Sequence, residues 1–558
     1  MAVRHATEAY LASLGPGPHD VVEVATRVTD LANAAVHTYN SATGARIASL
    51  ANPTVSQVAT CLVRLHDVVR IDEPGTASDF AQLAVYMTAG PMAGTYSTDE
   101  SDIRRLARLY RQGMTRAMVA DLVQELMDQT PSVAVCSDRD LVAVENGVFD
   151  YRTKELRPFD KSVVLLSKSP IPFVRDAPSP TIHNDEDGTD WTLDQCVEEL
   201  ALVPGADGLP DQVDPEVVEV LWQIVGACVR PLVHWNKAAF LYSTTGNNGK
   251  GTFCRLLRGV VGHSATNIPL VDLGKEFHLE SLSNRSAIIA DENDVGVFLD
   301  RVANLKALIT KDVVLVNRKG KVPVALRWRG FMVQCLNGLP ESRDKSQSFY
   351  RRQLFVPFRN RFEGRERKYV KEEYLERRDV LEYALSKTLT MPDYYELVTP
   401  SASRSLMAQY QLANDNVREF WLEVSGRSGH DADGNPRPEE GRELVWDVVP
   451  NAFLYDLYTA WMSRTNPSGK PIGRNRFLMS LRELVGEEAT GWKAPVGTNG
   501  VPATLRVTCE MNAPERLIDV YDLRGWMDPT YSGIDWRKRC RPPRPAGDYF
   551  VRGIVRDS

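Results

Sequence analysis

The chain has 558 residues, of which 43% are hydrophobic and 25% charged, and its formal net charge is −7. The length predicts several domains, and the composition is typical of a soluble protein with buried cores, with no apolar run of about 18 residues to span a membrane. The eight cysteines form no Cys-x-x-Cys pair and the N-terminus has no apolar signal core, so the sequence argues against a zinc ribbon and for a cytoplasmic protein with reduced thiols. Nucleic-acid binding would need local basic patches.

The first part of the chain is expected to be helical. Residues 1–79 are predicted to form an α-rich N-terminal region without recognisable chemistry, and helices are expected to continue over residues 78–130, where apolar residues recur at helical spacing. A group of arginines shares this region, and a solvated helix face is preferred over a nucleic-acid contact for them: Arg104, Arg105, Arg108, Arg111 and Arg116.

Short strands and turns are predicted after residue 140. Residues 141–150 alternate around an Asn146-Gly147 turn, which predicts a hairpin, and residues 163–172 predict a further strand. Helices are expected over residues 191–202 and 217–229, the second packing toward the strand that follows.

Residues 238–252 predict a phosphate-binding loop. An apolar strand, Ala238–Tyr242, is followed by a polar glycine-bearing turn, by Lys250 and by a helix. Small residues let backbone N–H groups face phosphates, and the helix N-terminus adds partial positive charge. The usual pattern has Gly at the position of Thr244 and Ser or Thr at that of Gly251. The expected ATP ligands are Thr245, Gly246, Asn247, Asn248, Gly249, Lys250, Gly251, Thr252 and Phe253. The alternative is an ordinary Gly/Asn turn.

Two further apolar runs end in polar side chains. Residues 286–290 precede Asp291 and Glu292, and a strand there would place Asp291 near Mg²⁺, together with the Thr252 hydroxyl, while Glu292 polarises the attacking water. Residues 331–336 precede Asn337, whose amide is expected to bind the γ-phosphate or its water. The alternatives are a core strand ending in a solvated turn and a common Asn-Gly turn.

Basic residues concentrate downstream of these runs. Residues 318–361 contain eleven Lys and Arg against two acids, in a chain that is acidic overall. Arg318, Lys319 and Lys321 lie at an expected hairpin tip, a shape suited to following a phosphate backbone, although a solvated turn is the alternative. Arg351 and Arg352 precede another strand, and arginine suits the stabilisation of charge during phosphoryl transfer, often across a subunit boundary.

The loop, the Asp-Glu strand, the Asn strand and the Arg pair, in this order, resemble superfamily 3 helicases, in particular the phage, plasmid and poxvirus primase–helicase branch. Residues 305–312 are similar to that family's segment between the acidic and Asn motifs, with Lys311 where the family usually has Gly. Residues 143–160 are similar to the helicase-associated domain that precedes the motor.

The resemblance implies an α/β fold with an AAA+-like P-loop NTPase core, assembling into a hexameric ring that moves on single-stranded DNA. Lys250, Asp291, Glu292 and Asn337 would then act within one subunit, the basic tip would line the pore, and an Arg of the pair, with Arg352 preferred, would reach the neighbour's nucleotide. Many relatives carry an N-terminal primase, and no convincing acidic motif precedes residue 140, so a helicase without primase activity is expected.

The C-terminal part is expected to be a winged-helix-like DNA-binding domain. Helices are predicted at residues 414–424, 452–464 and 474–485, with strand-like pieces at 491–495 and 504–509. Arg474 and Arg476 would face DNA from the third helix, and a helical assembly domain is the alternative. Residues 425–441 are expected to form an exposed linker, and residues 536–544 a basic tail.

The sequence therefore predicts an ATP- and Mg²⁺-dependent DNA helicase of a phage or mobile-element replisome, acting in the bacterial cytoplasm on single-stranded and forked DNA beside a separate primase and polymerase. A DNA-binding initiator without unwinding is the alternative, and a nucleotide kinase is the less favoured one. The expected domains are 1–79, N-terminal; 80–214, helicase-associated; 215–370, ATPase core; 371–411, helical connector; and 412–558, winged-helix-like.

Overall fold

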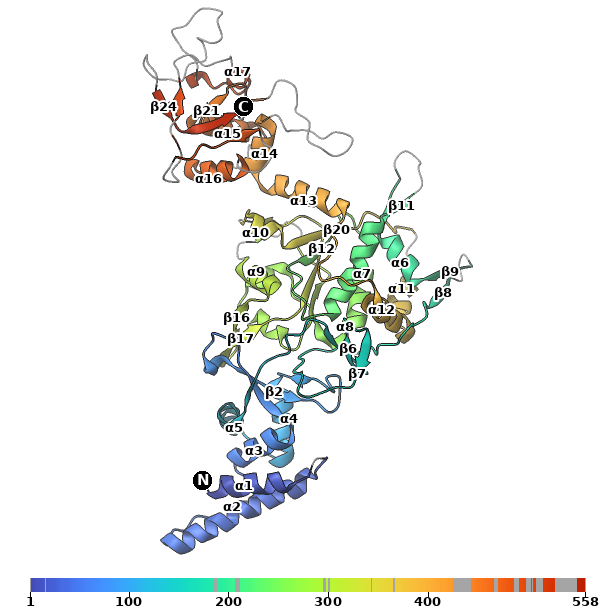
Figure 1. Ribbon diagram of the computed structural model, residues 1–558, viewed down its shortest axis with the longest axis vertical. Helices are drawn as coiled ribbons and strands as arrows, with labels where there is room; N and C mark the ends of the chain where they lie inside the picture. Colours follow the sequence, from blue (N-terminus) through green and yellow to red (C-terminus); the bar gives the residue numbers. More distant parts are fainter. Residues whose placement is uncertain are drawn as a thin grey trace, which may run out of the picture. The chain divides into compact units, whose positions relative to one another are not determined.

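The computed structural model (Figure 1) describes a mixed α/β protein that divides into two compact units, Met1–Arg404 and Ser405–Ser558. None of the helices in the described ranges combines the length and apolar character needed to cross a bilayer. The description covers residues 2–556 except 16, 185–187, 206–210, 295–297, 300–301, 343, 365–366, 426–442, 466–469, 486–490, 498–502, 504, 508–514 and 527–548.

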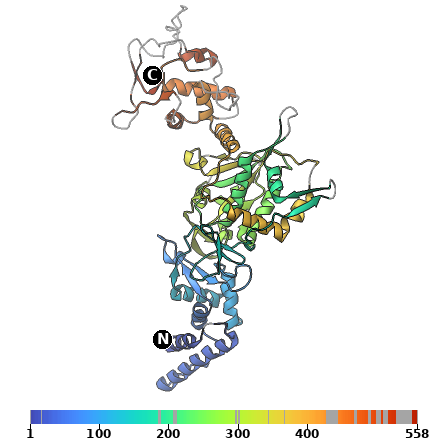
Figure 2. The same cartoon turned by 45° about the vertical axis from the view of Figure 1, so that its right-hand side comes forward.

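The first unit begins with helices and continues with a small sheet. The helices predicted for the start of the chain are present, and α1 and α2 lie side by side in Figure 2. The prediction of helices over residues 78–97 was wrong, because short runs rich in β-branched and apolar residues there pair as strands in the order β3-β2-β1-β4. The elements are α1 (Ala2–Ser13), α2 (Val21–Thr43), α3 (Val55–Leu65), β1 (Val68–Ile71), η1 (Ser78–Phe80), β2 (Gln82–Tyr86), β3 (Tyr96–Ser97), α4 (Glu100–Tyr110), α5 (Arg116–Gln129) and β4 (Ser132–Val133).

The predicted hairpin is present as β5 (Leu141–Val144) and β6 (Gly147–Asp150), with Glu145 and Asn146 in its turn. The prediction of a strand at residues 163–172 was wrong. This segment forms no strand, because its backbone bonds to several different segments, for example Val164 O to Cys136 N (2.9 Å) and Ser169 N to Ala143 O (3.0 Å). The elements that follow are β7 (Glu155–Arg157), β8 (Thr181–Asn184), β9 (Thr189–Thr192), α6 (Leu193–Leu200), β10 (Leu202–Val203) and β11 (Gln212–Val213).

A five-stranded parallel sheet forms the centre of the first unit. Its order is β13-β14-β18-β12-β20, and four of the strands are almost wholly buried, as parallel strands covered on both faces are. Helices α7, α8 and α12 pack against one another (Figure 1). Helix α7 contacts β18, and α8 contacts β14. The elements are α7 (Pro215–Val229), β12 (Ala238–Tyr242), α8 (Lys250–Val261), β13 (Ala265–Thr266), β14 (Ala287–Ala290), β18 (Phe331–Leu336), β20 (Gln353–Pro357) and α12 (Arg378–Thr390).

The strand order reverses the direction in which the chain crosses the sheet. The chain leaves β12 toward β13 and leaves β18 toward β20, which are opposite directions across the sheet. Right-handed crossovers in opposite directions lie on opposite faces, so the carboxyl ends of β12 and β18 form a topological switch point. Open parallel sheets bind their ligands at such points.

Shorter elements surround the central sheet. The predicted basic hairpin is present as β16 (Val313–Arg318) and β17 (Lys321–Arg327), whose outward-facing Leu315 and Val322 are each 56% exposed. The other elements are η2 (Gly262–Ser264), η3 (Leu270–Gly274), η4 (His278–Leu282), β15 (Phe298–Leu299), α9 (Ala303–Thr310), β19 (Glu341–Ser342), α10 (Gln347–Tyr350), α11 (Lys368–Glu372) and η5 (Tyr374–Glu376).

Lys311, just before this hairpin, has a backbone conformation that favours glycine. Its φ of 57° lies in the left-handed region, which side chains other than glycine rarely adopt. The side chain is 3% exposed, and its ammonium donates to the carbonyls of Pro231 and Val233. Burial, assisted by the nearby Arg329, lowers the pKa of Lys311 to about 7.

Lys311 should make stability depend on pH. Its folded-state pKa of about 7 lies below the ordinary value of 10.5, so between these values the unfolded chain binds more protons and stability rises with pH. We expect Lys311→Met to stabilise the protein relative to wild type by about 2–4 kcal/mol more at pH 6 than at pH 9.5. Urea unfolding of both proteins across this range measures the difference, and parallel pH profiles would contradict it.

The second unit contains the three helices predicted for the C-terminal part. Its sheet has the order β21-β25-β22, with α16 immediately before β22 in the chain. The linker expected at 425–441 falls almost entirely outside the described residues, and so does the basic tail at 536–544. The elements from residue 401 on are α13 (Ser401–Asn414), α14 (Asn416–Val424), β21 (Val448–Pro450), α15 (Asn451–Thr465), α16 (Arg474–Val485), β22 (Trp492–Lys493), β23 (Leu505–Val507), α17 (Arg516–Val520), η6 (Arg524–Trp526), β24 (Tyr549–Val551) and β25 (Gly553–Arg556).

Candidate functional site

The loop between β12 and α8 has the backbone geometry of an anion-binding turn. Asn247 and Gly249 both have positive φ (50° and 85°), and α8 begins at Lys250. In the described part of the chain, the N–H groups of Gly251 and Thr252 meet no hydrogen-bond acceptor. Thr245, Gly246 and Asn247 are exposed, whereas Asn248 is buried and its amide donates to the carbonyl of Thr245, which closes the loop. Free N–H groups at a helix start favour a bound anion.

Gly249 is required by this turn for two reasons. Its φ of 85° disfavours any side chain, and a Cβ there would lie 2.2 Å from Leu200 Cδ2. We expect Gly249→Ala to lower the free energy of unfolding of the first unit by about 1–3 kcal/mol. Gly246→Ala is the matched control, because a Cβ at Gly246 meets nothing within 4 Å. Urea midpoints of the two variants test the difference, and equal midpoints would contradict it.

Lys250 and Asn337 meet at the switch point. Lys250 is 7% exposed, and its Nζ donates to Asn337 Oδ1 at 2.9 Å. β12 and β18 are adjacent and parallel, so the loop after one strand and the side chain after the other lie together. Burial lowers the pKa of Lys250. An ammonium with a neutral amide as its described partner, beside free helix N–H groups, is suited to a multiply charged anion.

Asp291 and Glu292 follow β14, which β18 separates from β12. Two strand spacings, about 10 Å, therefore separate the backbones of β14 and β12. Asp291 accepts two bonds from Arg258 of α8, both 3.0 Å, and this partner lowers the pKa of Asp291. Glu292 is exposed and has no partner among the residues described. The sequence interpretation missed Arg258, although it lies two helical turns after Lys250 on the same helix.

Two further side chains near these strand ends were also missed. Asn293 donates to Gln334 Oε1 and Cys335 O, both at 3.0 Å, and accepts from Leu270 N at 2.8 Å, so it fixes the segment after β14 to β18. The Lys371 ammonium lies 3.5 Å from where a Cβ at Gly251 would be. A lone Asn and an exposed Lys carry no recognisable sequence signal.

The remaining predicted nucleotide ligands differ in accessibility. Thr252 is half-buried on the first turn of α8. Phe253 was predicted among the ATP ligands, but its side chain is 1% exposed and packs with Phe358 in the core, so it faces away from the loop. The reason is helical periodicity, because a residue three positions after Lys250 begins the inward stripe of α8.

The two arginines before β20 differ in what surrounds them. Arg351 is exposed, and its guanidinium makes no hydrogen bond or ion pair with any described residue. Arg352 is half-buried, and its guanidinium donates to the carbonyl and hydroxyl of Ser348 in its own segment. Arg351 is therefore the one free to reach another molecule, whereas the sequence interpretation preferred Arg352.

The predicted DNA-binding residues lie on both units. Lys319, at the hairpin tip, is exposed, while Arg318 and Lys321 form ion pairs with Glu100 (2.5 and 2.8 Å). Arg474 and Arg476 are exposed on the first turn of α16 in the second unit.

Two segments of the chain match described protein families. Residues 59–187 match the family described as "D5 N terminal like", and residues 241–352 match a "Family of unknown function (DUF5906)". The chain thus carries a D5-like segment, which precedes the central sheet. No curated protein matches the chain.

Structures of the NrS-1 C-terminal region are similar to this chain at low identity. One apo structure is 12% identical, covers 90% of this chain and 99% of that one, and has a TM-score of 0.41. Two structures of its A form are 10% and 12% identical, each covering 67% of this chain and 78% of that one, with TM-scores of 0.36 and 0.39. A likeness at these TM-scores carries no argument about function.

Proposed function

We propose that this chain is an ATP-dependent DNA helicase of phage or mobile-element replication. The observation that carries the proposal is the buried Lys250 ammonium, held by Asn337 beside free helix N–H groups at a topological switch point. This arrangement fits a nucleoside triphosphate. The D5-like match over residues 59–187 and the motif order that resembles superfamily 3 helicases support a replication protein.

Each residue of the site has a role in this proposal. Mg²⁺-ATP, when bound, supplies the phosphoanhydride whose cleavage drives the motor. Lys250 binds the terminal phosphates and Asn337 orients the Lys250 ammonium. Thr252 and Asp291 would hold the cation when it is bound, with Asp291 positioned by Arg258. Glu292, which is exposed at the end of β14, accepts the proton of the attacking water.

The DNA and subunit contacts come from residues outside the sheet. Arg318, Lys319 and Lys321 bind the backbone of one strand, and Arg474 and Arg476 contact DNA from the second unit. In a ring of subunits, the exposed Arg351 reaches a neighbour's nucleotide. A hexamer is proposed because the resembling family assembles in this way.

A forked duplex tests the proposal. Wild-type protein with ATP and Mg²⁺ is expected to displace one strand, and its particle mass is expected to rise when ATP and single-stranded DNA are added. ATP-dependent DNA binding without strand displacement would favour an initiator. Phosphorylation of nucleoside monophosphates, without stimulation by DNA, would favour a kinase and overturn the proposal.

A further inference from the structure

Arg318 and Lys321 flank the hairpin tip, and both pair with one carboxylate from the D5-like segment. Arg318 binds Glu100 Oε1 at 2.5 Å, and Lys321 binds Glu100 Oε2 at 2.8 Å. Glu100 is the first residue of α4, and its two partners lie 218 and 221 positions further along the chain. The residues expected to bind DNA phosphates therefore already hold an anionic group.

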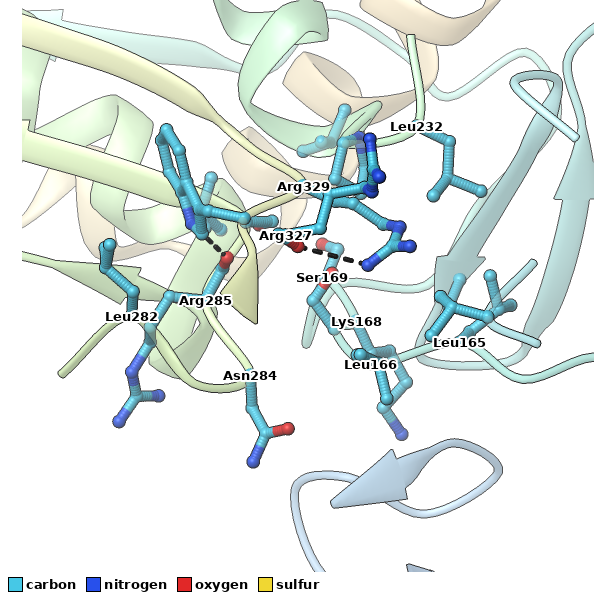
Figure 3. A pocket seen from close by; sticks show the side chains of 18 of the residues that line it. Leu165, Leu166, Lys168, Ser169, Leu232, Leu282, Asn284, Arg285, Arg327 and Arg329 are labelled. Carbon is cyan, nitrogen blue, oxygen red and sulfur yellow. Dashed lines mark hydrogen bonds between the residues drawn. The ribbon is translucent and has the colours of Figure 1, made fainter. Parts of the chain in front are cut away.

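A second carboxylate holds the other end of the hairpin more firmly. Glu73 is 6% exposed and pairs with Arg327 (3.0 Å) and Arg329 (3.1 Å). Figure 3 shows both arginines at a pocket that is also lined by Leu165 and Leu232. Breaking a buried pair leaves a charge without its partner and is strongly unfavourable. This end of the hairpin is therefore a fixed anchor.

The contact at the tip is much easier to exchange. The side chain of Glu100 is 30% exposed, against 6% for Glu73, and its partners Arg318 and Lys321 are 20% and 46% exposed. Ion pairs that water reaches contribute little net stability. A cleft of about 490 Å³ runs between α4 and the hairpin, with Glu100, Arg318 and Lys321 in its lining. An anion from solution can thus approach the pair directly.

We propose that Glu100 is an internal competitor for the DNA backbone: without DNA it occupies Arg318 and Lys321, and a phosphate of single-stranded DNA must displace it. The inference rests on the proposed function, because it takes the hairpin as a DNA site. Phosphate and carboxylate oxygens accept the same bonds from guanidinium and ammonium groups. The displaced Glu100 stays favourable at the N-terminus of α4, where the helix dipole attracts negative charge. DNA binding then releases the hairpin tip from Glu100, while Glu73 keeps its ion pairs with Arg327 and Arg329 at the other end of the hairpin.

Removal of the Glu100 charge should raise DNA affinity. DNA binds only when Arg318 and Lys321 are released from Glu100. The apparent dissociation constant for DNA therefore rises with the fraction of molecules in which Glu100 occupies them. We expect Glu100→Gln to bind a fluorescein-labelled oligothymidylate about five- to thirtyfold more tightly than wild type, in low salt without nucleotide. Fluorescence anisotropy measures both affinities. Glu23→Gln is the matched control with unchanged affinity, because Glu23 also lies in the first turn of a helix.

The outcomes separate this inference from the proposed function. Binding by wild type with no gain in Glu100→Gln overturns the competitor role alone, whereas no DNA binding by either protein overturns the proposed function as well. Hydrogen exchange of wild-type protein tests the inference without any variant. Amides of residues 100–104 are expected to exchange faster after oligothymidylate is added, and unchanged exchange in a protein that binds the DNA would overturn the displacement of Glu100.

Discussion

Lys250→Met is expected to lower kcat for DNA-stimulated ATP hydrolysis by at least about a hundredfold, because it removes the charged donor at the switch point. Methionine keeps the length and apolar stem of the buried lysine, so the fold should survive. The substitution also leaves Asn337 Oδ1 without the 2.9 Å bond that it accepts from Lys250. Steady-state ATPase assays with and without single-stranded DNA give the ratio.

Lys237→Met is the matched control for this prediction. Lys237 precedes the same strand, β12, at its opposite end, and donates to Thr399 Oγ1 at 2.7 Å. Because it lies away from the carboxyl edge of the sheet, its loss should leave ATP hydrolysis unchanged. DNA binding without nucleotide should be the same in both variants and in wild type. Full ATP hydrolysis and unwinding by Lys250→Met would refute the proposal that this chain is an ATP-driven motor.

Glu292→Gln is expected to reduce kcat by at least about a hundredfold while KM for ATP changes less than about threefold. The amide keeps the shape of the side chain but cannot accept a proton from water. A loss in kcat without a loss in affinity indicates an interaction made only in the transition state. Single-turnover hydrolysis and equilibrium binding of a fluorescent ATP analogue separate the two effects.

Asp294→Asn serves as the control for the acid pair. Asp294 is an exposed acid two positions further on, and its neutralisation removes the same charge from the same segment. We expect it to retain hydrolysis within a factor of about two. If both substitutions reduced kcat equally, the loss would reflect the net charge of the segment, and Glu292 would have no special role.

Some of the differences between prediction and structure arise because strand pairing depends on distant segments of the chain. Residues 82–86 lie within the range predicted to be helical, yet they pair with β1. The segment 163–172 has strand-like composition but no single partner strand, and its backbone groups bond to several neighbours. Such pairings depend on segments far away in the chain, which single-sequence periodicity does not detect.

The sequence analysis named individual residues of the candidate site but did not predict which of them contact one another. Asp291 and Asn337 were chosen because each follows an apolar run, and β14 and β18 end directly before them. Lys250 was chosen because it follows the glycine turn after the strand Ala238–Tyr242. The bond from Lys250 to Asn337 needs β18 to lie next to β12, and the pairing of Asp291 with Arg258 needs α8 to lie over β14. The spacing of these residues along the sequence does not predict either of these two neighbours.

The sequence alone determined the strand, the glycine turn and the helix around Lys250, and the basic tip of the hairpin, because backbone torsion preferences and local periodicity act between residues close in the chain. Only the tertiary structure decided which side chains meet: strand order placed Asn337 beside Lys250, and packing of the D5-like segment placed Glu100 against Arg318 and Lys321. The reason is physical, since contacts between distant residues depend on how whole elements bury their apolar faces, and no short stretch of sequence contains that information.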